Sequence, residues 1–170
     1  MRSTDPGTLR IIDLWKFRSR KSNKWYIVEV EHFPGQFLGI KFYWKGVAAS
    51  KDRYSLLTND YEPRTIVCSC INIMYEYFRN NQEASFGFVG ASDLLISKII
   101  NAPNKRFRFY RRMMLSIFGS KTFAQCYDWK NSMYLLVNRI MLNNGKLSLP
   151  QIEAEISKLY EGDYSFVIEP

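Results

Sequence analysis

Hydrophobic and polar positions follow a helical spacing most clearly in residues 65–80, TIVCSCINIMYEYFRN. At about 100° per residue the apolar side chains of this stretch share one broad arc, and Thr65, Asn72 and Arg79 fall opposite them. The arc contains Ile66, Val67, Cys70, Ile71, Ile73, Met74, Tyr77 and Phe78. We therefore predict an amphipathic helix packed on a sheet, in which Cys70 is a small buried hydrophobic residue.

Alternating and β-branched stretches predict the strands. WYIVEVEHF (25–33) and FLGIKFYWKG (37–46) flank Pro34-Gly35 and predict a hairpin, and RYSLLTND (53–60) predicts a shorter third strand. A further strand is expected in ASFGFVGAS (84–92), and two more at 123–129 and 132–139. Strands that come in runs favour an antiparallel arrangement over a parallel one.

Two more helices complete the pattern. Residues 105–118 are followed by Gly119, and Ser148-Leu-Pro-Gln151 is a capping box that opens a helix to about Tyr160. The segment 93–103, which ends at Pro103, is compatible with a short helix or with a loop. The order is then βββ-α-β-α-ββ with a C-terminal helix. This order predicts a single α+β domain over 1–170, with its core at 25–139 and an acidic helix and tail at 148–170.

Composition places the chain among folded proteins. Of its 170 residues, 46% are hydrophobic and 16% aromatic, and no run of about 18 apolar residues is present. The first 17 residues hold Asp5 and Asp13 and lack the apolar stretch of a secretory signal. We therefore expect no membrane association and a cytoplasmic location.

The inventory of reactive side chains is small. The chain has three cysteines and one histidine, His32, which argues against a disulfide framework and against a zinc site. No nucleotide-binding fingerprint, catalytic triad or carboxylate pair can be named from the spacing. The sequence therefore assigns no catalytic residue, metal or cofactor, and it leaves open whether the protein is an enzyme, with a non-enzymatic role favoured.

Charge gives the most specific clue to function. The net charge is +8, and the acids are concentrated in residues 148–170, which leaves +12 on the first 147 residues. Between Asp93 and Asp128 there are seven basic residues and no acid. A local positive field of this kind favours phosphate-bearing partners, nucleic acid first among them.

The helix predicted at 105–118 contains the densest basic cluster, NKRFRFYRRMM. Its aromatic and methionine side chains share one side, while Arg108, Arg112 and Lys105 lie opposite, with Arg106 and Arg111 at the two edges. Positive charge at the start of a helix is disfavoured unless an anion relieves it. We expect an anion-binding site made of Ser92, Lys105, Arg106, Arg108, Arg111 and Arg112. The alternative is a basic face that pairs with acids of the C-terminal helix or with an acidic protein partner.

The same stretch resembles a bacterial domain family of unassigned activity. The matching features are a helix, a strand that ends in Gly90-Ala91-Ser92, and a helix that opens Arg106-Phe-Arg108-Phe-Tyr110-Arg111. The resemblance covers about 25–139 and departs at 93–103, where the family is more compact. The resemblance implies the order of helices and strands, and because the family has no assigned activity it implies none for this chain.

The order of elements is also similar, more faintly, to that of the GNAT acyltransferases. This resemblance implies that Asn104 and Tyr110 lie near the family's asparagine and its acid tyrosine, with the spacing one residue short. The glycine-rich loop with which that family holds the pyrophosphate of coenzyme A is replaced by Tyr61-Glu-Pro-Arg-Thr-Ile-Val, where Arg64 alone is suited to phosphate. The sequence thus ranks anion binding first, and acyl transfer or protein interaction as alternatives.

Overall fold

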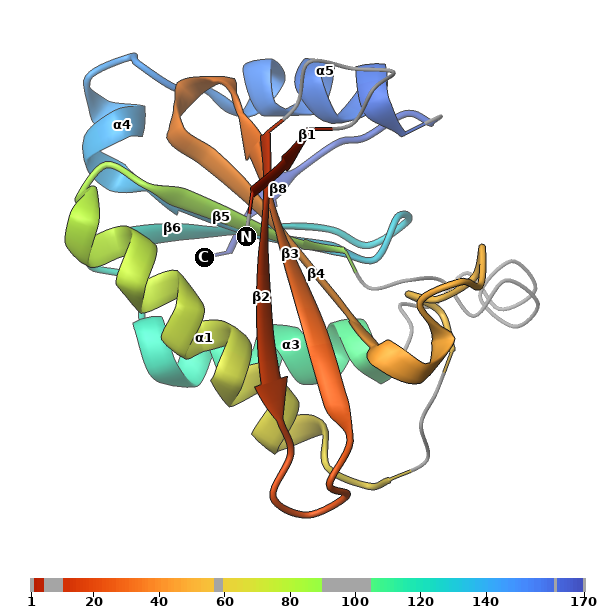
Figure 1. Ribbon diagram of the computed structural model, residues 1–170. Helices are drawn as coiled ribbons and strands as arrows, with labels where there is room; N and C mark the ends of the chain where they lie inside the picture. Colours follow the sequence, from red (N-terminus) through yellow and green to blue (C-terminus); the bar gives the residue numbers. More distant parts are fainter. Residues whose placement is uncertain (1, 5–10, 57–59, 90–104, 161, 170) are drawn as a thin grey trace.

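The computed structural model describes residues 2–4, 11–56, 60–89, 105–160 and 162–169. Within them the chain forms one mixed sheet of eight strands in the order β1-β2-β3-β4-β5-β7-β6-β8 (Figure 1). All neighbouring strands are antiparallel except β4 and β5, which run parallel. This is the predicted α+β fold with its βββ-α-β-α-ββ core.

The first half of the sheet is an antiparallel meander. It consists of β1 (Arg2–Thr4), β2 (Ile11–Arg18), β3 (Trp25–Phe33) and β4 (Phe37–Trp44). A short 3-10 turn at Pro34–Gln36, with Gly35 at φ 73°, joins β3 to β4. The predicted hairpin is thereby confirmed.

The second half holds β5 (Ser85–Val89), β6 (Phe123–Asp128), β7 (Met133–Asn138) and β8 (Val167–Ile168). Helix α1 (Pro63–Asn80) connects β4 to β5, and helix α3 (Lys105–Phe118) precedes β6. Two further helices, α4 (Arg139–Asn143) and α5 (Leu149–Leu159), follow β7. The capping box of Ser148 and Gln151 is present as predicted.

Helices cover both faces of the sheet (Figure 1). On one face α1 and α3 enclose the first core, to which Val28, Ile40, Phe86 and Met114 contribute. On the other face α4 and α5 enclose a second core around Leu135, with Ile152 and Ile156. The predicted apolar arc of α1 is confirmed, since Ile66, Val67, Cys70, Ile71, Ile73 and Met74 are buried.

One predicted strand is wrong. Residues 51–55 form turns, and residues 57–59 lie outside the described part of the chain. The third strand of the initial run is instead β2, which precedes the predicted pair. The sequence obscured β2 because Asp13, Lys16 and Arg18 interrupt its apolar residues, as is common where a strand is only partly covered.

Two smaller differences concern the ends of elements. The strand predicted at 132–139 is followed from Arg139 by the short helix α4, and the strand predicted at 84–92 is described over Ser85–Val89. The segment 93–103 lies outside the described residues. Among the described helices, none combines the length and the apolar character needed to cross a bilayer.

Candidate functional site

The pairing between the two parallel strands at the centre of the sheet ends before β4 does. Strand β4 pairs with β5 over Phe37–Ile40, opposite Ser85–Phe88, and then continues to Trp44. Beyond Ile40 its outer edge is therefore not hydrogen-bonded to β5 in the described part of the chain. The carboxyl ends of parallel strands are where open sheets most often bind ligands, because helices and loops diverge there.

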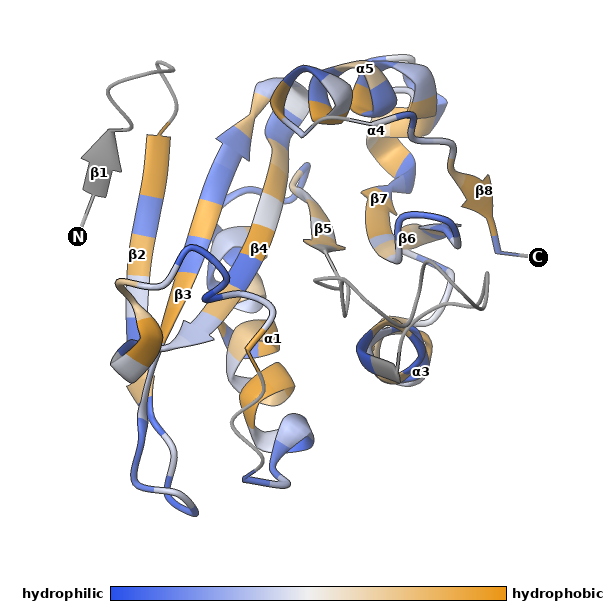
Figure 2. Cartoon of the chain, turned by 90° about the vertical axis from the view of Figure 1, so that its right-hand side faces the viewer, coloured by the Kyte–Doolittle hydropathy of each residue, from blue (hydrophilic) through white to orange (hydrophobic). Residues whose placement is uncertain are grey.

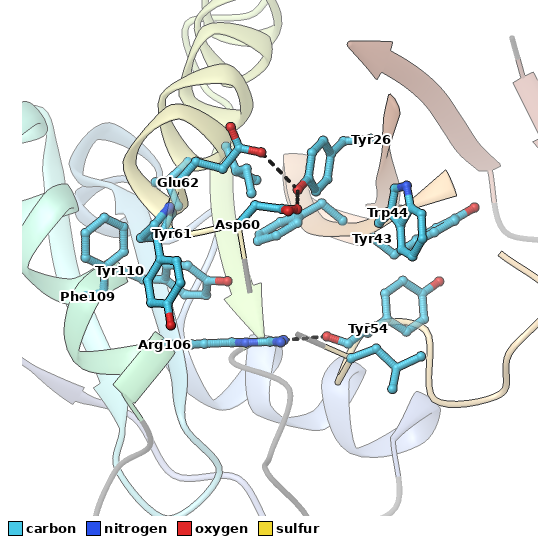
Figure 3. A pocket seen from close by; sticks show the side chains of 15 residues that line it. Tyr26, Tyr43, Trp44, Tyr54, Asp60, Tyr61, Glu62, Arg106, Phe109 and Tyr110 are labelled. Atoms are coloured by element: carbon cyan, nitrogen blue, oxygen red, sulfur yellow. Dashed lines mark hydrogen bonds between the residues drawn. The ribbon is translucent and has the colours of Figure 1, made fainter. Parts of the chain in front are cut away.

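A pocket of about 400 Å³ lies at this opening. It is bounded by the end of β4, the start of α1 and the start of α3 (Figure 3). Its lining is mainly aromatic and aliphatic: Tyr26, Phe42, Tyr43, Trp44, Tyr54, Leu56, Tyr61, Pro63, Ile66, Val67, Phe109 and Tyr110. Asp60, Glu62 and Arg106 are its charged members. A volume of this size and a lining of this kind are typical of small-molecule sites.

Tyr110 is the most unusual polar group in the pocket. Its side chain is 5% exposed and packs against Phe42 and Phe88. Its hydroxyl forms no hydrogen bond with any described residue, and Figure 3 shows it directed toward the interior of the pocket. Burial raises the pKa of Tyr110, so the phenol keeps its proton at neutral pH. A buried phenol is normally hydrogen-bonded, so this one is available to a ligand.

The acidic wall of the pocket is held by neighbouring donors. Tyr26 donates to Glu62, with 3.3 Å between oxygens, and Glu62 also accepts from Ser19 and Ser22. Asp60 is paired with Lys24 at 2.8 Å. Asp60 is thus paired with a cation and Glu62 is hydrogen-bonded by hydroxyl groups, so both carboxylates already have partners within the chain.

Arg106 forms part of the pocket wall. Its guanidinium donates to the backbone carbonyl oxygens of Tyr54 and Ser55, at 2.6 and 2.9 Å (Figure 3). It therefore ties the start of α3 to the turn segment after β4. The adjoining side chain of Tyr54 donates to Glu29, and burial raises the pKa of this tyrosine.

The arginines of α3 separate into two groups. Arg108 and Arg112 are exposed, and neither forms an ion pair or hydrogen bond with a described residue. Arg106 and Arg111 lie at the edges of the exposed face and are half-buried, as the periodicity predicted. Phe107, Tyr110 and Met114 are buried, whereas Ile117 is 39% exposed.

Arg111 contacts the C-terminal tail. It forms a bidentate pair with Glu169, in which Nη2 and Oε2 are 2.8 Å apart, and it lies over the rings of Trp129 and Tyr127. The hydrogen bonds to Glu169 raise the pKa of Arg111 further. One acid of the tail therefore does reach the basic helix, although it comes from the residue after β8 and not from α5.

For the remaining residues of the expected site, the structure describes little or nothing. Ser92 and Asn104 lie outside the described residues, and Lys105 is described only as the first residue of α3. The structure thus brings together Arg106 and Tyr110 at the pocket, and it places Arg108, Arg112 and Arg111 elsewhere on the helix.

Sequence reasoning missed the pocket. Its residues come from five separate segments of the chain, four within 26–67 and one in α3, and no single stretch has a pattern that indicates a pocket. In the described residues no three His, Cys, Asp or Glu side chains gather as a metal site. No protein-family model, no curated protein and no solved structure matches this chain.

Proposed function

We propose that this protein binds a small phosphate-bearing thioester of the acyl-coenzyme A type in the pocket, and that its activity is acyl transfer. The observation that supports this most is the Tyr110 side chain, which is 5% exposed and points into a mainly apolar pocket, and whose hydroxyl has no described hydrogen-bond partner. The resemblance to the GNAT acyltransferases is the second support, since the observed order of strands and helices is the order on which it rests.

The pocket suits the two chemical parts of such a ligand. An apolar arm and an acyl group would pack against Phe42, Val67 and Phe109, whose surfaces are aliphatic or aromatic. The phosphates would lie at the entrance, where Arg64 is exposed in the first turn of α1. Lys21 adjoins the same entrance, because its Nζ donates to the carbonyl oxygen of Tyr61 at 3.1 Å. These cations take the place of the missing glycine-rich loop.

The chemistry assigned to this chain is proton donation by Tyr110. When an acceptor amine forms its bond to the acyl carbon, the carbon–sulfur bond breaks and the leaving sulfur needs a proton. The phenol of Tyr110 is protonated at neutral pH, and its Oη would donate that proton as the thiolate leaves. The proton lost by the amine passes to solvent.

Calorimetric titration with acetyl-coenzyme A tests the binding step. We expect saturable binding with one site per chain, and loss of at least tenfold in affinity when Val67→Trp fills the pocket. The matched control is Arg79→Ala, on the same helix but paired only with Glu76 at the exposed surface. No saturable heat with the unchanged protein would contradict the proposal.

Tyr110→Phe separates binding from chemistry. The variant keeps the ring and its packing, so we expect unchanged affinity for acetyl-coenzyme A. Transfer to a panel of amine acceptors should fall about 10²-fold or more, the range of general acid catalysis. Equal transfer rates in the two proteins would show that Tyr110 is not the proton donor.

Nucleic-acid binding by α3 is a second candidate, and a separate observation favours it. Arg108 and Arg112 are four residues apart on the exposed side of the helix, and they have no described anionic partner. Two like charges at this spacing repel, and a bound phosphate would relieve that repulsion. Arg108→Ala with Arg112→Ala should therefore flatten the salt dependence of binding to labelled RNA or duplex DNA. Unchanged affinity and slope would exclude this surface.

A further inference from the structure

The hairpin between β2 and β3 is a second strongly basic feature. Residues 16–25, KFRSRKSNKW, contain Lys16, Arg18, Arg20, Lys21 and Lys24 and no acid. Figures 1 and 2 both show this hairpin extending past the end of α1, at the bottom of each view. Charge concentrated at a projecting turn reaches large partners more readily than charge on the flank of the molecule.

The turn is held in one conformation by the buried carboxylate of Glu62. Ser19 and Ser22 both donate to it, and the backbone N–H groups of Lys21 and Ser22 donate to Ser19 Oγ. Asn23 adopts a left-handed conformation, with φ 62°, which asparagine tolerates well. The cations are therefore displayed on an ordered support, which lowers the entropic cost of binding.

One face of the hairpin carries an exposed tryptophan between two cations. Trp25 lies opposite Arg18 in the register of β2 and β3, and its side chain is 42% exposed. Lys16 Nζ is 5.7 Å and the Arg18 guanidinium carbon is 6.0 Å from the ring centroid. No described carboxylate pairs with Lys16, Arg18 or Arg20. Tyr26 and Phe17 stack on the opposite face, toward α1, so this surface is separate from the pocket.

We propose that this face, defined as Lys16, Arg18, Arg20 and Trp25, is a docking surface for single-stranded nucleic acid. A base stacks on the indole of Trp25, and the phosphates on either side contact Lys16 and Arg18. Arg20, at the turn, contacts the next phosphate along the strand. Aromatic rings among cations are the usual means of binding single strands without sequence preference, because every base offers a flat face.

The proposal is independent of the pocket and of the arginines on α3. An unpaired strand fits this face better than a duplex, because a stacked base must leave its own helix to reach Trp25. An anionic membrane surface would also attract the cations, and the test below separates that partner by its lack of bases.

The experiment is fluorescence anisotropy with the full chain and two labelled oligonucleotides of twelve nucleotides, oligo-dT and its abasic analogue. Trp25→Leu should weaken binding of oligo-dT by about tenfold and leave the abasic strand nearly unchanged, because only stacking is lost. Lys16→Gln with Arg20→Gln should weaken both strands and lower the salt slope by about 1.4, or about 0.7 per phosphate contact.

Controls decide between surfaces and partners. Arg79→Gln removes an exposed cation of α1 that pairs with Glu76, and it should change neither affinity. Thermal unfolding of every variant should match the unchanged protein. An equal loss of affinity for both strands in Trp25→Leu would show that no base stacks on Trp25. Loss of affinity in Arg108→Gln with Arg112→Gln, but in neither hairpin variant, would assign binding to α3 and reject the proposal. Binding to phosphatidylserine vesicles without binding to either strand would identify a membrane surface and reject the proposal.

Discussion

Helix α3 and the β2–β3 hairpin each carry five basic residues within about ten positions, yet the structure uses them differently. On α3, Arg106 and Arg111 point along the surface and fix other segments, the turn after β4 and the C-terminal tail. On the hairpin, Lys16 and Arg18 lie over the ring of Trp25, Arg18 donates to the carbonyl oxygen of Asn23 in the same turn, and neither has an ion pair with a described carboxylate. A helix that lies on a core has neighbours on both flanks, whereas a projecting hairpin has few. A high density of basic residues in the sequence therefore does not identify a binding surface. What the cations contact depends on whether their segment is packed against the rest of the protein or projects from it.

The largest effect is expected where the hairpin meets α1. Glu62→Ala would leave the hydroxyls of Ser19, Ser22 and Tyr26 without their common acceptor in a buried place. We expect a loss of about 2–4 kcal/mol in the free energy of unfolding, measured by urea denaturation. Glu62→Gln retains one carbonyl acceptor and should lose less. If both variants lost the same small amount, the ordered turn would not depend on this carboxylate.

Arg106→Ala tests the corresponding anchor on α3. It removes two hydrogen bonds, to the carbonyl oxygens of Tyr54 and Ser55. A hydrogen bond that involves a charged group contributes about 1.5–3 kcal/mol to stability. We expect a loss of about 1.5–3 kcal/mol in unfolding free energy, together with weaker acetyl-coenzyme A binding because one wall of the pocket is released. Arg112→Ala is the matched control on the same helix. Equal stability of the two variants would show that Arg106 is not a structural anchor.

A smaller effect is expected at the C-terminal tail. Glu169→Gln weakens the bidentate pair with Arg111, which is partly exposed, so a loss of about 0.5–1 kcal/mol is expected. The readout is again urea denaturation, and added salt should reduce the difference between the two proteins. Deleting all of residues 148–170 would not test this contact, because it would also remove the buried Ile152 and Ile156.

The smallest effect is expected for the cations that form no ion pair or hydrogen bond with any described residue. Arg108→Ala, Arg112→Ala and Arg20→Ala should each change the unfolding free energy by less than about 0.5 kcal/mol. Their contribution would be visible only in ligand binding. A destabilisation above 1 kcal/mol in any of them would mean that the division between anchoring and displayed cations is wrong.

Much of the fold could be predicted from local pattern. The bounds of α3 were predicted as 105–118 and are Lys105–Phe118, because its apolar residues recur at helical spacing and Gly119 follows at φ 59°. The capping box at Ser148 and the buried arc of α1 were also predicted correctly from the sequence. Strand β2 was not, because a partly covered strand tolerates charges that break its alternation.

The candidate site depended far more on the tertiary structure. The sequence by itself determined that α3 has an apolar side and a basic side, since 3.6 residues per turn fixes which side chains share a face. It did not determine that Tyr110 would line a pocket, or that Arg106 would bind two backbone carbonyls some fifty positions away. Those facts follow from how β4, the turn segment after it, α1 and α3 meet in the folded chain, because contacts between distant segments have no local periodicity to reveal them.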